Sequence, residues 1–466
     1  MTPVTPTRLR ARFAETLSGL YGKEVPAYTT LVEVSHEVNS GVARAMGRDA
    51  ERLGSLDRVT AERHGAIRVG TPTEMAQVAR IFAAMGMSPT GFYDLRDASA
   101  SAVPVVSTAF RPTRADELAK NPFRVFTSLL ATGDQRFFSA DLSGRLETFL
   151  AGRELFAPRL LTLADRAITH GELSQIDAEE FLHLAAESFA LSNEPIDRSW
   201  YDELEKVSAV AADIGGVRST HINHLTPRVL DIDELYGRMT GRGIAMIDAI
   251  QGPPRWAGPD VLLRQTSFRA LSEPRRFRAD DGTITEGSLR VRFGEVEARG
   301  VALTPAGREH YDQAVVEIDT TTDADAAAIW TKHFPTSEQE LFSQGLGVYT
   351  VTAVTDKERD GRAPEGSIVD LINAGWLRAE PVVYEDFLPR SAAGIFQSNL
   401  TDAGSKDSTV GGMELDASWM EGVLGTALND PYDLYHAQHQ ASVDTALAEL
   451  GLPITAETPV PVPSSR

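Results

Sequence analysis

The feature that most constrains the fold of this chain is an order of elements that occurs twice. Residues 62–70 (ERHGAIRVG) predict a strand with His64, Ala66 and Arg68 on one face, because alternate side chains of a strand point to opposite faces. A helix then begins at a capping box formed by Thr71 and Glu74. The segments that we expect as the strands that follow are 91–96 (GFYDLR), 103–110 (VPVVSTAF) and 136–142 (RFFSADL).

The second occurrence begins near residue 222. A strand is expected to place His224, Thr226 and Arg228 on one face, and Asp231 or Asp233 caps a helix that runs to about Met239. Three strand candidates follow, at 244–250 (IAMIDAI), 261–271 (VLLRQTSFRAL) and 288–303 (SLRVRFGEVEARGVAL). The first strand of each unit carries the pattern His-x-x-x-Arg, in HGAIR and HLTPR. Repetition of both the order and the pattern indicates an internal duplication.

We therefore expect an α+β fold with two βαβββ modules. The predicted organisation is a helical segment at 1–60, a first module at 61–142, a helical insertion at 143–213, a second module at 214–305, a mixed C-terminal region at 306–452 and a Pro-rich tail at 453–466.

Composition limits the chemistry. The chain has 45 Lys and Arg against 66 Asp and Glu, a formal net charge of −21, which disfavours nucleic acid as a partner. It has no cysteine, which excludes disulfides, thiol nucleophiles, Cys-ligated zinc and iron–sulfur clusters. Metal ligands must come from ten His and the carboxylates, a donor set that favours Fe(II), Mn(II) or Zn(II). We find no signal-peptide core and no membrane-spanning stretch, and expect a soluble cytoplasmic protein.

The segment 288–300 contains the acids of greatest interest. As one continuous strand it would carry Leu289, Val291 and Phe293 on the same face as Glu295, Glu297 and Arg299. A carboxylate that continues an apolar face is costly unless it is paired, hydrogen-bonded or bound to a metal. Glu295 is therefore a candidate metal ligand. The alternative is that both acids pair with Arg290, Arg292 or Arg299 across strands.

Two imidazoles and one carboxylate form a facial triad that leaves coordination positions open. His64 and His224, from the first strand of each unit, and Glu295 would supply it. Arg68 lies roughly 13 Å along the strand from His64 and is placed to grip a substrate carboxylate.

Several alternatives remain open. His221 competes with His224 as the second imidazole, and Arg68 and Arg228 can also be read as surface ion pairs. His436 and His439 are three residues apart on an expected helix without an acidic partner at helical spacing, so we interpret them, and His310, as parts of exposed helix faces.

Five motifs resemble one known family. HGAIR, NHLTPR, LLRQTSF, FGEVEARG and YEDFLPRSAAGIFQSNL occur in the order found in the 2-oxoadipate dioxygenase/decarboxylase family, also called 2-hydroxyglutarate synthase, and the similarity runs from about residue 10 to 450. The resemblance implies the vicinal-oxygen-chelate superfamily, whose paired βαβββ modules wrap a metal. It also implies an Fe(II) enzyme that converts 2-oxoadipate and O₂ into D-2-hydroxyglutarate and CO₂ in lysine catabolism.

The resemblance also assigns roles to residues. It implies that His64, His224 and Glu295 bind the metal, with Glu297 as the fallback for the carboxylate. It implies that Arg68 binds the substrate and that the backbone N–H groups of Arg390 and Ser391, in the C-terminal region that completes the pocket, hold a substrate carboxylate. The family often has an apolar residue where this chain has Arg390. The rival functions are a Zn(II) or Mn(II) lyase or isomerase of the same fold that acts on a small oxo acid, and a non-catalytic binding protein.

Overall fold

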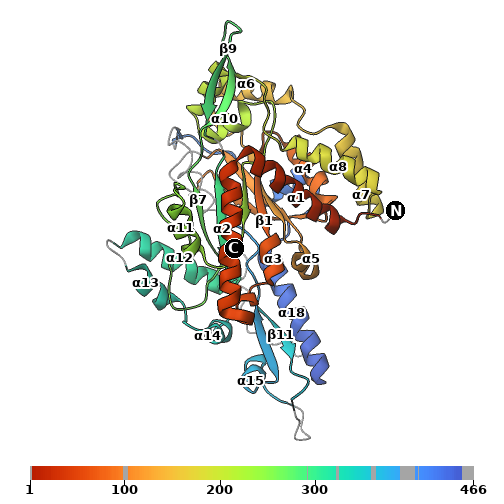
Figure 1. The fold of residues 1–466 in the computed structure, drawn as a ribbon, viewed down its shortest axis with the longest axis vertical. Coiled ribbons are helices and arrows are strands. Elements are labelled where there is room, and N and C mark those ends of the chain that lie inside the picture. The colour runs from red at the N-terminus through yellow and green to blue at the C-terminus, as the bar shows by residue number, and fades with distance from the viewer. Residues whose placement is uncertain are drawn as a thin grey trace.

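The computed structural model of this chain describes residues 3–97, 103–290, 292–321, 325–357, 364–388, 405–407 and 409–453. It is a mixed α+β structure, as expected (Figure 1). The chain begins with the helices α1 (Pro6–Glu24), α2 (Pro26–Met46) and α3 (Leu56–Ala61), with a short 3-10 turn, η1 (Gly47–Glu51), after α2. None of the helices in the described ranges is long and apolar enough to cross a bilayer.

A five-stranded sheet forms the centre of the molecule. Its strands, in spatial order, are β2 (Ser88–Asp94), β3 (Val105–Arg111), β4 (Arg124–Leu130), β1 (Arg63–Val69) and β6 (His224–Pro227). β1 runs parallel to β4 and antiparallel to β6. The helix α4 (Pro72–Ala83) connects β1 to β2, and its predicted capping box is confirmed, with the Thr71 hydroxyl and the Glu74 carboxylate each accepting from the other's backbone N–H.

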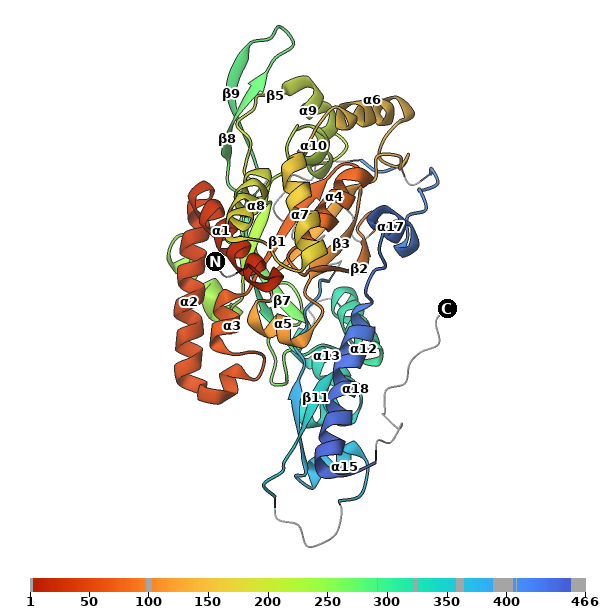
Figure 2. The same ribbon diagram turned by 90° about the vertical axis from the view of Figure 1, so that its right-hand side faces the viewer.

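The two faces of the sheet are buried in different cores. Ile67 and Val69 of β1 belong to a large apolar cluster that the N-terminal helices share with α4. Figure 2 shows α4 and α7 (Pro158–His170) lying over this face, with α1 and α8 (Gln175–Ser188) beside them. Ala66 and Phe126 face the other way, into a second cluster. This second face also carries His64 and Arg68, because the side chains of β1 alternate.

One predicted strand is wrong. Residues 136–142 were expected to be the last strand of the first unit, but that strand is β4. Residues 136–139 form a turn segment and 140–142 are the first residues of α6 (Ala140–Ala151). Ser139 caps α6 by accepting from the Leu142 N–H, a local signal that favours a helix start over a strand. β4 (RVFTSLL) is buried along its whole length, as is typical of a central strand.

The second unit also departs from the expected pattern. β6 leads into α11 (Ile232–Gly241), which Asp231 caps, and β7 (Leu263–Phe268) pairs antiparallel with β10 (Gly294–Arg299). The segment 244–250 forms no named strand, and Met246 makes an isolated bridge to Phe268.

The expected continuous strand at 288–303 is instead divided between β9 (Ile284–Leu289) and β10. β9 pairs with β8 (Glu273–Arg278) in a separate hairpin, so Leu289 does not share a face with Glu295. Two contacts mark the place of the division. The Arg292 guanidinium forms buried ion pairs with Glu273 and Glu24. Gly294, the first residue of β10, lies so close to the Phe268 ring that a Cβ there would be 1.8 Å from it.

The remaining elements lie beside this centre or extend from it, with the hairpin of β8 and β9 at one end and α15 (Ile368–Asn373) at the other (Figure 1). The insertion between the two units contains α6, α7 and α8, the two-residue strand β5 (Ile196–Asp197), α9 (Arg198–Glu205) and α10 (Ala209–Gly215). The C-terminal region contains α12 (Pro305–Thr320), α13 (Ala326–His333), α14 (Glu338–Ser343), β11 (Tyr349–Ala353), α15, β12 (Leu377–Pro381), α17 (Ala417–Leu424) and α18 (Pro431–Leu450). β11 and β12 form an antiparallel pair against which α18 packs.

Candidate metal centre

The strand register brings two distant histidines together. In the antiparallel pair of β1 and β6, His64 lies opposite Thr226 and Ala66 lies opposite His224. The two imidazoles are therefore diagonal neighbours on one face, and their ring centroids are 5.2 Å apart. β10 runs alongside β6 through a parallel bridge between Arg228 and Glu297. This third strand carries Glu295 to the same place.

His64, His224 and Glu295 form a compact, buried group. One Glu295 oxygen, Oε2, lies 3.2 Å from His64 Nε2 and 3.1 Å from His224 Nδ1. One potential ligand atom from each of the three residues lies within 4.8 Å of the others. Two imidazoles and a carboxylate in this arrangement can hold a divalent ion and leave part of its coordination sphere open.

The protonation states of the group suit a metal site. Burial is the main cause that lowers the pKa of His224, to about 4, so this imidazole is neutral at pH 7 and has a lone pair for an ion. Burial raises the pKa of Glu295, but His224 and His64 together lower it below its ordinary value, so the carboxylate is charged. Burial lowers the pKa of His64, but Glu297 and Glu295 outweigh it and raise this pKa overall. A cation among these carboxylates can take the place of that proton.

Glu297 lies on the far side of the His64 ring. Its Oε2 is 3.0 Å from His64 Nδ1, so the two acids of β10 contact the two ring nitrogens of one histidine. Arg299 donates to both Glu297 oxygens, at 2.7 and 3.0 Å. Burial raises the pKa of Glu297, but Arg299 and His64 hold it well below its ordinary value. Glu297 is thus placed to orient His64, which is the usual task of a carboxylate behind a metal-binding histidine.

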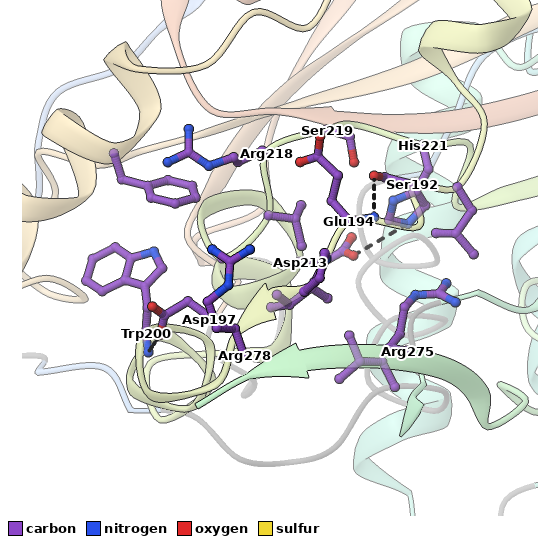
Figure 3. Close-up of a pocket in the computed structure, with 17 residues that line it drawn as sticks. Ser192, Glu194, Asp197, Trp200, Asp213, Arg218, Ser219, His221, Arg275 and Arg278 are labelled. Atoms are coloured by element: carbon purple, nitrogen blue, oxygen red, sulfur yellow. Dashed lines mark hydrogen bonds and ion pairs between the residues drawn. The ribbon is translucent and has the colours of Figure 1, made fainter. Parts of the chain in front are cut away.

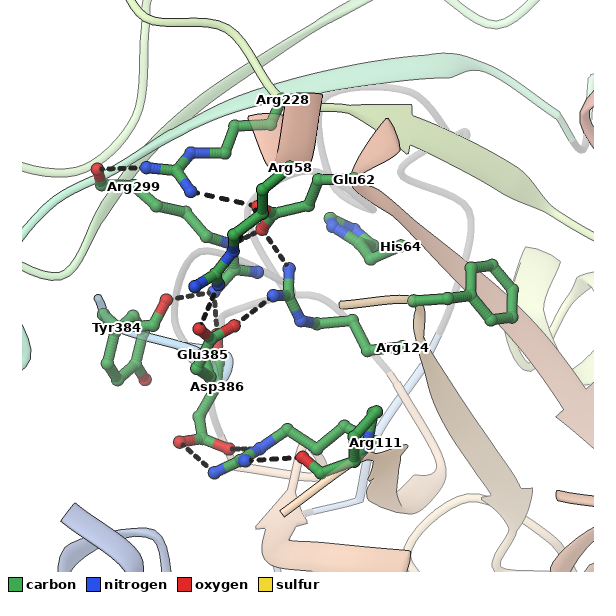
Figure 4. A network of polar contacts seen from close by, with 12 residues as sticks. Arg58, Glu62, His64, Arg111, Arg124, Arg228, Arg299, Tyr384, Glu385 and Asp386 are labelled. Atoms are coloured by element: carbon green, nitrogen blue, oxygen red, sulfur yellow. Dashed lines mark hydrogen bonds and ion pairs between the residues drawn. The ribbon is translucent and has the colours of Figure 1, made fainter. Parts of the chain in front are cut away.

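A buried network of arginines and carboxylates lies next to His64 (Figure 4) and contacts Glu297 through Arg124 and Arg299. Arg124 contacts Glu62 at 2.8 Å and Glu297 at 3.4 Å, and it also pairs with Glu385. The Arg228 side chain is 1% exposed and lies 3.0 Å from Glu62, so the alternative that Arg228 forms a surface ion pair is wrong.

The same network holds the segment that contains the YEDFLP motif. Arg111 binds Asp386 through two hydrogen bonds of 2.7 and 3.1 Å. Tyr435 donates to the same Asp386 carboxylate. Four members of this network were not identified from the sequence: Glu62, Arg124, Glu385 and Asp386. Glu385 and Asp386 nevertheless lie in the motif YEDFLPRSAAGIFQSNL. The network fixes this segment beside the candidate metal site.

Aromatic rings enclose the two histidines. Phe387 packs edge-on against His64 with centroids 5.1 Å apart, and Phe126 lies 5.1 Å from Phe387. Phe293 stacks on His224 at 5.4 Å. These rings limit the access of water to the ligand atoms.

Arg68 lies on the face of β1 that carries His64, and it is 4% exposed, which contradicts a surface ion pair. Its Nη1 donates to Asp213 of α10. His221 is also on this side, with its Nε2 3.4 Å from Asp213 Oδ1. The structure therefore groups His224, rather than His221, with His64 and Glu295. Arg390 and Ser391 lie outside the described residues.

The other histidines lie elsewhere. His436 is exposed, as expected, but His439 is buried and its Nδ1 is 2.6 Å from the Tyr349 carbonyl, so the exposed-face interpretation of His439 is wrong. A helix that packs on a hairpin must bury one face, and His439 lies on that face of α18. His310 is half-buried and contacts the His333 carbonyl.

Comparisons with known proteins give one consistent result. The model of the 2-oxoadipate dioxygenase/decarboxylase family matches residues 13–399. A 2-oxoadipate dioxygenase/decarboxylase of Mycobacterium tuberculosis is 58% identical over 437 residues, covering 93% of this chain and 97% of that protein. The protein of that name from Pseudomonas putida is 39% identical over 470 residues, covering 96% and 98%.

A solved structure agrees with these sequences. The crystal structure of the hydroxyglutarate synthase from Pseudomonas putida in complex with 2-oxoadipate matches with a TM-score of 0.82 at 36% identity. The match covers 97% of this chain and 99% of that chain. With a family model that matches most of the sequence and relatives that align over nearly their full length, the chain belongs to the 2-oxoadipate dioxygenase/decarboxylase family.

Proposed function

We propose that this protein is an Fe(II)-dependent dioxygenase that converts 2-oxoadipate and O₂ into D-2-hydroxyglutarate and CO₂, as a step of lysine catabolism. The observation that carries the proposal is the buried group of His64, His224 and Glu295, with one ligand atom from each within 4.8 Å. Relatives of that name align over 93% or more of the chain, and a matching structure is described as a complex with 2-oxoadipate. The reaction balances, because the C1 carboxylate leaves as CO₂ and both atoms of O₂ enter D-2-hydroxyglutarate, one in its new carboxylate and one in its hydroxyl group.

The metal would be held by His64 Nε2, His224 and Glu295. Bound Fe(II) supplies polarisation of the 2-oxo group and the redox chemistry that O₂ requires. The residues of the chain do the remaining work. Glu297 holds the His64 ring through its other nitrogen, 3.0 Å away, and Phe387 and Phe293 keep water from the ligand side.

Arg68 would bind the distal carboxylate of the substrate. It stands on the same face of β1 as His64, with only the small Ala66 between them along that face. A guanidinium binds a carboxylate through two parallel hydrogen bonds, which stops the substrate from rotating. We propose that the backbone N–H groups of Arg390 and Ser391 hold a substrate carboxylate as well.

We also propose that the centre of the fold is a duplicated βαβββ module of the vicinal-oxygen-chelate type, with the domain boundaries expected from the sequence. Three features of strand pairing support this. β1 is parallel to β4 and β4 is antiparallel to β3, as β6 is parallel to β10 and β10 is antiparallel to β7. The segment that includes Met246 bridges β7 antiparallel, as β2 pairs with β3. The hairpin of β8 and β9 would then be an insertion into the second module.

The proposal is tested by oxygen consumption. Apoprotein is loaded with Fe(II) without oxygen, 2-oxoadipate is added, and air is then admitted. We expect O₂ uptake, CO₂ and D-2-hydroxyglutarate in equal amounts. Absence of O₂ uptake in the Fe(II)-loaded protein would remove the proposal.

A lyase or isomerase that uses Zn(II) or Mn(II) is the second candidate, because two imidazoles and a carboxylate also suit these ions. Turnover of a 2-oxo acid by Zn(II)- or Mn(II)-loaded protein without oxygen would favour it. A third candidate, a non-catalytic binding protein, requires that His64→Ala leave ligand binding unchanged.

A further inference from the structure

Asp213 provides a fixed carboxylate behind Arg68. It lies near the end of α10, in the helical insertion, and its side chain is 3% exposed. Its Oδ2 accepts from Arg68 Nη1 and, at 3.0 Å, from Asn223 Nδ2. Its Oδ1 lies 3.4 Å from His221 Nε2. Every polar atom of this carboxylate therefore faces a named partner from β1 or from the segment before β6.

This carboxylate stays charged at neutral pH. Burial raises the pKa of Asp213, but His221 and Arg68 lower it below its ordinary value. Burial lowers the pKa of His221 to about 4, so this imidazole is neutral at pH 7. The formal charges in the cluster at pH 7 are therefore those of the Arg68 guanidinium and the Asp213 carboxylate, which cancel.

Asp213 and His221 also form part of the wall of a cavity of about 220 Å³ (Figure 3). The cavity lies between the helical insertion and the hairpin of β8 and β9, and its charged residues include Glu194, Asp197, Arg218, Arg275 and Arg278. Glu194 is exposed at its rim. Asp213 thus contacts Arg68 and also lines this hollow, whereas Arg68 is not among the residues that line it.

An arginine binds a carboxylate ligand more selectively when a second group fixes its guanidinium. Its side chain has many rotamers, and a guanidinium binds a carboxylate well when its planar fork is already held in position. Asp213 holds one edge of the Arg68 fork, and Asn223 holds Asp213. Asn223 immediately precedes His224, so the position of the guanidinium is linked to the strand that carries a candidate metal ligand.

We propose that Asp213 is a positioning residue, which holds the Arg68 guanidinium toward the distal carboxylate and so sets the preference for a dicarboxylic over a monocarboxylic 2-oxo acid. This inference rests on the proposed function, because it takes Arg68 as the group that binds the substrate. It adds a residue from the helical insertion to the determinants of specificity.

The test compares two ligands of equal chain length. Dissociation constants of 2-oxoadipate and of 2-oxohexanoate are measured by calorimetry on the Fe(II)-loaded protein without oxygen. In Asp213→Asn we expect at least a tenfold weaker binding of 2-oxoadipate, as for loss of a charge-assisted contact, and 2-oxohexanoate within twofold of the wild type. Glu194→Gln is the matched control, since it removes a carboxylate of the same cavity, and it should leave both constants unchanged.

A second variant guards against loss of folding. Asn223→Ala removes the hydrogen bond that holds Asp213 but keeps the ion pair, and we expect about a threefold loss for 2-oxoadipate alone. Equal loss for both ligands, no loss, or tighter binding of 2-oxoadipate in the folded variants would overturn the inference. The proposed function fails differently: in that case the wild-type protein itself neither binds nor oxidises 2-oxoadipate.

Discussion

Replacement of Glu297 by Gln tests how the metal ligands are held. Glu297 Oε2 is 3.0 Å from His64 Nδ1, and Arg299 and Arg124 contact the same carboxylate at 2.7 and 3.4 Å. Gln has nearly the same size as Glu, so the change removes the charge and leaves the packing. We expect weaker metal binding, because His64 loses the group that orients its ring.

The contacts of Glu297 predict that the loss of metal affinity lies near the upper end of the range usual for outer partners of metal ligands. Loss of an outer partner typically costs 10- to 100-fold in metal affinity, or about 1.4–2.7 kcal/mol. In Glu297→Gln the new amide nitrogen would face the Arg299 guanidinium in either orientation, because Arg299 donates to both Glu297 oxygens. Both orientations bring two donors together, and the one that points the nitrogen at His64 also forces Nδ1 to be an acceptor, which favours the wrong tautomer for binding through Nε2.

The affinity is measured by anaerobic calorimetry of the apoprotein with Fe(II), with activity recorded separately. Glu380→Gln is the control, since Glu380 is an exposed carboxylate of β12. An affinity of Glu297→Gln within twofold of wild type would refute the orienting role. A loss as complete as that in Glu295→Gln would also contradict it, because Glu297 would then behave as a ligand.

Three further predictions concern stability. Thr71→Ala should lower the free energy of unfolding in urea by about 1 kcal/mol, through loss of the α4 cap, whereas Thr73→Ala on the exposed side of the same turn should have little effect. Phe13→Ala should cost about 3–5 kcal/mol in the same assay, because this ring is fully buried against Phe123 and Phe189. Burial raises the pKa of Glu62, but Arg228 and Arg124 hold it below its ordinary value, so its contribution is present above about pH 4.3 and lost as pH falls. Urea titrations between pH 3 and 7 should therefore show a shallower acid dependence in Glu62→Gln; an unchanged slope would contradict this assignment.

The features of the site that depend on a single strand could be predicted from the sequence. Alternation along a strand places His64 with Arg68, and His224 with Thr226, on single faces, and the structure keeps both relations. The cost of a buried carboxylate identified Glu295, which is indeed buried against both histidines, although the continuous apolar face assumed in that argument is divided between β9 and β10. These inferences need no knowledge of which strands are neighbours.

What could not be predicted depends on pairing between distant segments. Arg68 and its partner Asp213 are 145 residues apart, and Arg124 reaches Glu385 across 261 residues. The sequence around one residue of such a pair does not indicate which residue is its partner. Two of the wrong strand predictions have different origins. At 136–142 the hydrophobic alternation was followed although a local signal, the Ser139 cap, favours a helix start. At 288–303 the alternation was read without the long-range contacts of Arg292 and Gly294.

Each candidate ligand is followed by an arginine at the same spacing. The direction of each strand, which the spacing does not give, determines where that arginine lies relative to the candidate metal site. Arg68, Arg228 and Arg299 each stand four residues after His64, His224 or Glu295. β1 and β6 are antiparallel, so equal steps along them lead to opposite ends of the site. β6 and β10 are parallel, so Arg228 and Arg299 end together, where Glu62 and Glu297 neutralise them. Arg68 is thereby placed at the other end, beside Asp213. The repeated spacing thus places one guanidinium near the proposed substrate site and two among the carboxylates beside the candidate metal ligands.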